Sequence, residues 1–212
     1  MWDHIQTLAM TKRRKWTAIP GLLALASAAV VLSAYSGASS SQNNSPVQPI
    51  AFPHPLHAAG NLNMNCLYCH NTANKSPDPG MPAVSTCMGC HLIARADRPE
   101  IQKLARYYAA GHGKPVPWVR IHKLPEYVRF PHMRHVNVGV TCQTCHGQVQ
   151  QMNQVYQYSS LNMGWCVKCH VNGYDPVEGL KATGYPGTDT ITAVTPAAER
   201  KRARYDCASC HY

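Results

Sequence analysis

The chain has 212 residues, with 14 glycines, 16 prolines and only two phenylalanines, and its mean hydropathy is −0.29. This composition excludes a fold that depends on a large aliphatic core, and it favours turns and irregular structure. The formal net charge of +10 would suit nucleic acid or an anionic membrane surface, unless bound acidic groups offset it.

The first predicted element is a membrane-spanning helix at residues 16–36. No charged side chain occurs from Thr17 to Tyr35, and this run is about as long as a bilayer core requires. Basic residues occupy 12–15 and none follows before Lys75, so we expect residues 1–15 in the cytoplasm and the rest of the chain on the periplasmic side. A cleaved signal peptide is the alternative, because small residues follow the apolar run.

An exported domain at 51–212 is predicted to follow a linker at 37–50 that is rich in Ser, Asn, Gln and Pro. The motif Phe-Pro-His-x-x-His occurs twice in this domain, at Phe52–His57 and at Phe130–His135. The repeat predicts two halves, 51–117 and 118–212. Helices are expected at 99–110 and 196–207 and no strand is expected, so the fold class is mostly irregular and α-helical.

The ten cysteines form five copies of Cys-x-x-Cys-His, and none is left over. This is the attachment signature of c-type haem, in which two thiols bind the porphyrin and the following histidine is the proximal iron ligand. A zinc site or a disulfide framework does not need a histidine after every second cysteine. We therefore predict five haem c groups, bound covalently by Cys66, Cys69, Cys87, Cys90, Cys142, Cys145, Cys166, Cys169, Cys207 and Cys210, with proximal ligands His70, His91, His146, His170 and His211.

Five haems would change what the composition implies. Each porphyrin is a large flat apolar surface, so the haems are expected to form the core that the side chains do not provide. Their propionates, about two per haem, would offset the formal charge, so the charge does not support nucleic-acid binding. Folding is expected to depend on haem attachment, as it does in other proteins whose folding is coupled to a cofactor.

Seven histidines remain for the distal side of the irons, and His4 lies on the cytoplasmic side of the predicted helix. Histidines spaced i, i+3 diverge from one another, so each member of such a pair is expected to ligate a different haem. A methionine thioether is a rival ligand, and Met152 and Met163 lie near haem motifs. The distal candidates are His54, His57, His122, His132 and His135, with His112 competing with His122 for the fifth place.

A Phe-x-His-x-x-His turn before Cys-x-x-Cys-His resembles the class III cytochromes of the c3 and c7 group, in which both histidines are distal ligands of different haems. A longer pattern is similar to the pentahaem cytochrome subunits of alternative complex III, and this resemblance covers most of residues 16–211. It is carried by Trp118 with His122-Lys-Leu-Pro125, by Phe130–His135, by Cys142-x-x-Cys-His-Gly147 and by Leu161-Asn-Met-Gly-Trp-Cys166.

The resemblance implies a membrane complex that oxidises quinol and reduces a periplasmic carrier. The implied partners are quinol-binding membrane subunits, an iron–sulfur subunit and a monohaem cytochrome c. The chain itself is then expected to be an electron-transfer subunit at the cytoplasmic membrane, and not an enzyme in isolation. No catalytic residue is predicted, because the histidines suffice to close every iron.

Two alternatives differ in what they require. A quinol dehydrogenase of the NapC/NrfH type has a similar size and topology, but its first haem motif follows the membrane helix more closely. A multihaem reductase needs an open iron with proton donors nearby.

Overall fold

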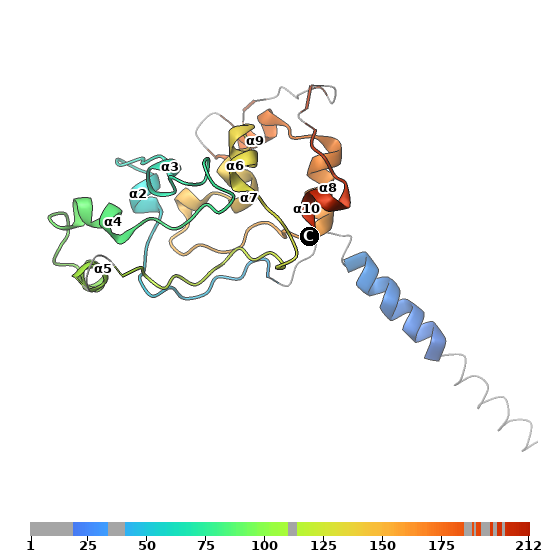
Figure 1. The fold of residues 1–212 in the computed structure, drawn as a ribbon, viewed down its shortest axis with the longest axis horizontal. Coiled ribbons are helices and arrows are strands. Elements are labelled where there is room, and N and C mark those ends of the chain that lie inside the picture. Colours follow the sequence, from blue (N-terminus) through green and yellow to red (C-terminus); the bar gives the residue numbers. More distant parts are fainter. Residues whose placement is uncertain are drawn as a thin grey trace, which may run out of the picture.

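The structure is a computed structural model that describes residues 19–33, 41–109, 114–184, 188, 190–191, 196, 199–200 and 202–212. Residues 19–33 form an exposed helix that projects away from the other described segments (Figure 1). None of the helices in the described ranges combines the length and the apolar character needed to cross a bilayer. The span predicted at 16–36 begins and ends outside these ranges, and so does the predicted cytoplasmic segment 1–15.

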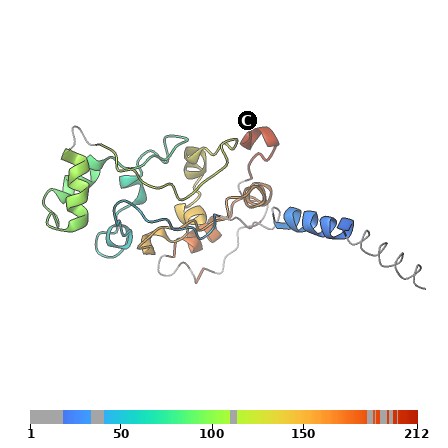
Figure 2. The same ribbon diagram turned by 90° about the horizontal axis from the view of Figure 1, so that it is seen from below.

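Short helices joined by irregular segments make up the rest of the described chain, as the composition predicted. They run from α4 and α5 at one end, through α2 and α3, to α6 and α7 and then to α8, α9 and α10 (Figures 1 and 2). No strand occurs in this part of the chain, which contains an isolated antiparallel bridge between Val128 and His211. The elements are α2 (Pro55–Ala58), α3 (Cys66–Cys69), α4 (Val84–His91), α5 (Pro99–Ala109), α6 (His132–Asn137), α7 (Cys142–His146), the 3₁₀ helix η1 (Val149–Gln151), α8 (Met163–Asn172), α9 (Pro176–Ala182) and α10 (Cys207–Cys210).

One of the two predicted longer helices is confirmed and the other is wrong. The helix expected at 99–110 is α5, which begins with Pro99 and has Glu100 in its first turn. The described residues between 196 and 206 are not helical. The backbone there is bound to α8 instead: the Ala203 amide donates to the His170 carbonyl, and the Arg204 carbonyl lies 2.5 Å from Nδ1 of His170.

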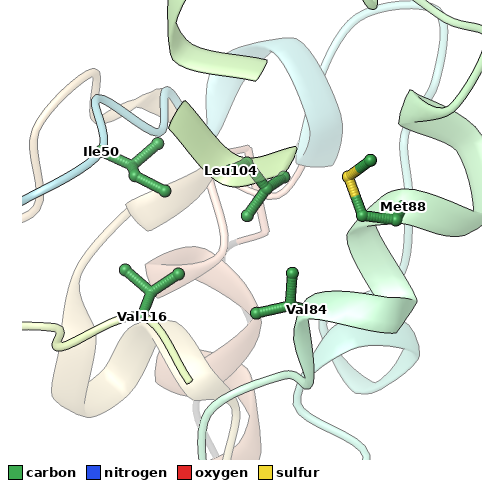
Figure 3. Packing of buried hydrophobic residues seen from close by; sticks show 5 residues of the cluster. All are labelled: Ile50, Val84, Met88, Leu104 and Val116. Carbon is green, nitrogen blue, oxygen red and sulfur yellow. The ribbon is translucent and has the colours of Figure 1, made fainter. Parts of the chain in front are cut away.

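A small apolar core lies in the two-motif half of the chain (Figure 3). It holds α4 against α5, and the segments at residues 50 and 116 close it from the other side. Five buried side chains form this cluster, far fewer than a domain of this length needs for stability. They are Ile50, Val84, Met88, Leu104 and Val116.

The segment predicted as a linker is hydrogen-bonded along its described part, residues 41–50. The Asn43 amide donates to the Gln157 carbonyl at 2.8 Å, and the Gln157 amide donates to the Asn44 carbonyl at 3.0 Å. Further along, Gln48 exchanges two hydrogen bonds with the backbone of Val119. Since Ile50 then enters the core of the first half, this segment joins the two halves of the domain.

Candidate haem-binding sites

The five Cys-x-x-Cys-His motifs are numbered here in chain order, and each lies on its own short helix: α3, α4, α7, α8 and α10. The i, i+3 spacing places both thiols of a motif on one face of a helical turn. Side-chain caps start two of these helices, with Asn65 accepting from the Leu67 amide and Asn162 accepting from the Trp165 amide, each at 2.9 Å. All ten cysteines are free and exposed or half-buried, so each motif presents two thiols that can add to a porphyrin.

Three imidazole pairs have the separation that a shared iron requires. Because a metal–imidazole bond is about 2.0 Å long and the ring nitrogen lies about 1.1 Å from the ring centre, two rings on opposite sides of one metal have centres about 6 Å apart. The ring centres are 6.0 Å apart for His57 and His91, and 6.1 Å apart for His135 and His170. They are 6.4 Å apart for His132 and His146, with the ring planes inclined by 18°.

The two Phe-Pro-His-x-x-His repeats have the same three-dimensional arrangement. In the first repeat, the Phe52 ring stacks on His57 at 4.5 Å and meets His54 edge-on at 4.9 Å. In the second repeat, Phe130 stacks on His135 at 4.3 Å and meets His132 edge-on at 4.8 Å. The two histidines of each turn therefore point to different neighbours, as the i, i+3 spacing predicted.

Each repeat also faces its own two motifs in the same order. The second histidine of each turn pairs with the later motif: His57 with the second and His135 with the fourth. The first histidine of the second turn, His132, pairs with the third motif. His54 completes the pattern, since burial and then the neighbouring His70 of the first motif lower its pKa to about 4.

Backbone carbonyls orient most of these rings through Nδ1. A ring that donates Nδ1–H to a carbonyl keeps its Nε2 lone pair for a metal. Nδ1 of the proximal histidine His91 lies 2.8 Å from the Ala94 carbonyl. Three of the distal candidates are held in the same way, His57 by Pro53 at 3.3 Å, His135 by Pro131 at 3.1 Å and His132 by Pro77 at 3.3 Å.

Burial keeps several of these imidazoles neutral, which is the form that binds a metal. It lowers the pKa of His146 to about 3, with a further contribution from His122. It lowers the pKa of His122 to about 4, and it lowers the pKa values of His70, His132 and His135 as well. The donor set therefore fits iron: paired thiols, neutral imidazoles, and ring separations of about 6 Å in three pairs.

His122 lies beside the third motif in a different geometry. Its Nε2 atom is 3.2 Å from Nδ1 of His146, and the two ring centres are only 4.3 Å apart. This separation fits a hydrogen bond between the rings and is too short for a metal between them. A distal role for His122 elsewhere stays a prediction.

The positions of the other distal candidates do not indicate an iron that they would bind. His112 lies outside the described residues. Met152 is 8% exposed and follows η1, whereas Met163 is 67% exposed and begins α8. Their roles as ligands stay predictions.

The fifth motif is clamped by a segment that the sequence did not single out. The Tyr127 ring stacks on His211 with centres 5.7 Å apart, and Val128 and His211 form the isolated bridge. The Arg129 amide donates to the Cys210 carbonyl at 2.7 Å, and the Arg129 guanidinium lies 4.3 Å from the centre of the Tyr212 ring. The one signal in the sequence is the position of this segment, directly before the second repeat.

Paired thiols on helices and imidazoles in facing pairs define a multihaem c-type cytochrome that transfers electrons. Comparison with known proteins agrees. The family model of cytochrome c3 matches residues 134–212, which hold the third, fourth and fifth motifs and the last two residues of the second repeat. The chain is also similar to the menaquinone reductase multiheme cytochrome c subunit of Nitratidesulfovibrio vulgaris (strain Hildenborough). The two are 26% identical over 145 residues, which cover 59% of this chain and 68% of that protein. The match supports the predicted c3-type character for residues 134–212, and the relative supports a multihaem cytochrome c.

Proposed function

We propose that the chain is a pentahaem electron-transfer subunit of a membrane quinol-oxidising complex of the alternative complex III type. The observation that carries this proposal is that distal and proximal imidazoles face each other in pairs. Three pairs have ring centres 6.0–6.4 Å apart, and His54 lies beside His70. Four irons closed on both sides in this way would have no position for a substrate, which supports conduction over catalysis.

Bound haem iron would supply one-electron redox chemistry. The ten thiols would hold the porphyrins, and the carbonyls of residues such as Ala94 and Pro77 orient the imidazoles that would bind the irons. An Nδ1–H donated to a carbonyl makes the imidazole a stronger ligand, which is one way in which a protein tunes a metal.

Membrane attachment is part of the proposal. The apolar run at 16–36 and the basic residues before it support a single-pass anchor with a cytoplasmic N-terminus and a periplasmic haem domain. The partners are then quinol-binding membrane subunits, an iron–sulfur subunit and a monohaem cytochrome c. Within such a complex the chain does not itself bind quinol.

The similarity to a menaquinone reductase subunit favours a second candidate, in which the same haems carry electrons toward menaquinone. The complex purified from its native membrane separates the two. Menaquinol with an oxidised periplasmic cytochrome tests the first direction, and menaquinone with a reduced cytochrome tests the second. The proteins that co-purify with the chain also test the NapC/NrfH-type alternative, because a quinol dehydrogenase of that type would have a terminal reductase as its single partner.

The conduction proposal itself is tested by haem stoichiometry and spin state. We expect five haems per chain by pyridine haemochrome analysis and mass spectrometry, an oxidised protein that is mainly low-spin, and little carbon monoxide binding after reduction. Several high-spin irons together with rapid carbon monoxide binding would instead support a multihaem reductase.

A further inference from the structure

We infer that the five haem motifs form one line in the order second, first, third, fourth, fifth, so that the haems of the second and fifth motifs are the two ends of the conducting path. This inference rests on the proposed electron-transfer function and deepens it. It differs from chain order at one place: the first motif, and not the second, is joined to the other half of the domain.

The junction between the halves is formed by the first and third motifs. The thiols of Cys66 and Cys142 lie beside each other. The proximal histidines of the same two motifs, His70 and His146, are also neighbours.

The backbone around this junction supports the same contact. Helix α6 starts on the segment that follows the first motif: the His132 amide donates to the Pro77 carbonyl at 3.1 Å, and the Met133 amide donates to the Ser76 carbonyl at 3.2 Å. At the other end of α6, the side-chain amide of Asn137 donates to the Asn74 carbonyl at 3.1 Å. The second repeat is therefore built against the chain that leaves the first motif.

The second motif lies on the outer side of the first. His57 pairs with His91 of the second motif, and the Met64 amide, two residues before the first motif, donates to the His57 carbonyl at 2.9 Å, so the two motifs are adjacent. Helix α4, which carries the second motif, packs on α5 in the apolar core. These two helices form one end of the described domain, with α3 between them and α7 (Figures 1 and 2).

The three motifs of the second half continue the line. Helix α6 carries both His132, which pairs with His146 of the third motif, and His135, which pairs with His170 of the fourth, so these two motifs are neighbours. The Ala203 amide, a few residues before the fifth motif, donates to the His170 carbonyl of the fourth. The contact of Nδ1 of His170 with the Arg204 carbonyl ties α8 to the segment that leads into α10.

A linear order has a consequence that can be measured. Loss of an internal haem divides the remaining haems into two groups, whereas loss of a terminal haem leaves one connected group. The first and second motifs give a matched pair of variants, C66S/C69S and C87S/C90S, because both lie in the first half and each removes one haem.

The experiment uses the full chain in its native complex, with four haems remaining in each variant as checked by mass spectrometry. Reduction through the natural donor is followed by stopped-flow absorbance. In C87S/C90S we expect the four haems to equilibrate as one group. In C66S/C69S we expect a division into one haem and three, with one group reduced in the fast phase and the other delayed by at least tenfold. Division in C87S/C90S with a single group in C66S/C69S would overturn the order.

Iron positions in the unmodified complex, obtained by electron cryo-microscopy, provide a second test that does not depend on the folding of a variant. The iron of the first motif is expected to have the irons of the second and third motifs as its nearest neighbours. The inference would be overturned if the iron of the second motif were closer to the iron of the third motif than the iron of the first motif is. Either failure leaves the proposed function intact if all five haems are still reduced by the donor.

Discussion

The third motif has two imidazoles near its proximal ligand, and the structure predicts that only one of them closes its iron. The ring of His132 is 6.4 Å from that of His146, close to the separation of about 6 Å that a shared iron requires. The ring of His122 is 4.3 Å away and meets Nδ1 of His146 at 3.2 Å. His132→Ala is therefore expected to open one iron of five, so that about one fifth of the haem becomes high-spin. His122→Ala is expected to leave all axial ligands of that iron in place.

The assay is electron paramagnetic resonance of the oxidised protein, with the high-spin signal quantified against total haem. Carbon monoxide binding after reduction gives an independent measure of the same open position. His122→Gln is the matched control, because an amide oxygen can still accept from His146. Its spectrum is expected to lie closer to the unmodified protein than that of His122→Ala, because the donated Nδ1–H strengthens the ligand. A fully low-spin His132→Ala protein beside a His122→Ala protein that is one-fifth high-spin would refute the reasoning.

Two further predictions concern stability and can be checked by thermal unfolding of the haem-loaded protein. Leu104→Ala, at a side chain that is 6% exposed in the apolar core, should lower the free energy of unfolding by about 2–4 kcal/mol. Val47→Ala, at a side chain that is 84% exposed, should change it by less than about 0.5 kcal/mol, and equal losses would contradict the importance of this core. Gly147→Ala should cost more than Gly139→Ala: both glycines have positive φ values, +69° and +91°, but only at 147 would the new β-carbon meet a neighbour, the Tyr158 ring at 2.7 Å. Similar losses for the two glycine variants would show that the ring moves aside without cost.

Local spacing was sufficient to predict the attachment chemistry, because a Cys-x-x-Cys-His motif completes its covalent site within five residues. The same holds for the repeat: the i, i+3 spacing of His54 and His57 predicted that they diverge, and the structure places them toward different motifs. The helix α5 was predictable from its starting proline and its apolar periodicity.

Contacts between distant segments could not be predicted in this way. The helix expected at 196–207 has good local propensity, but the backbone of Ala203 and Arg204 binds α8 instead. His122 was chosen as a distal candidate from its local context, whereas its position against Nδ1 of His146 depends on how two segments 24 residues apart pack together. The clamp of residues 127–129 on the fifth motif depends on two segments that are distant in the sequence and meet only in three dimensions.

The Phe-Pro-His-x-x-His turns also impose an order on maturation. Each turn contacts two motifs that follow it in the chain, as His57 does with His91 and His135 does with His170. A turn is therefore complete only after both of its haems have been attached. The chain would then mature in two stages, first with two haems and then with three. A chain stopped between these stages would leave the surface around Cys66 uncovered and accessible to the haem-attachment machinery or to a protease.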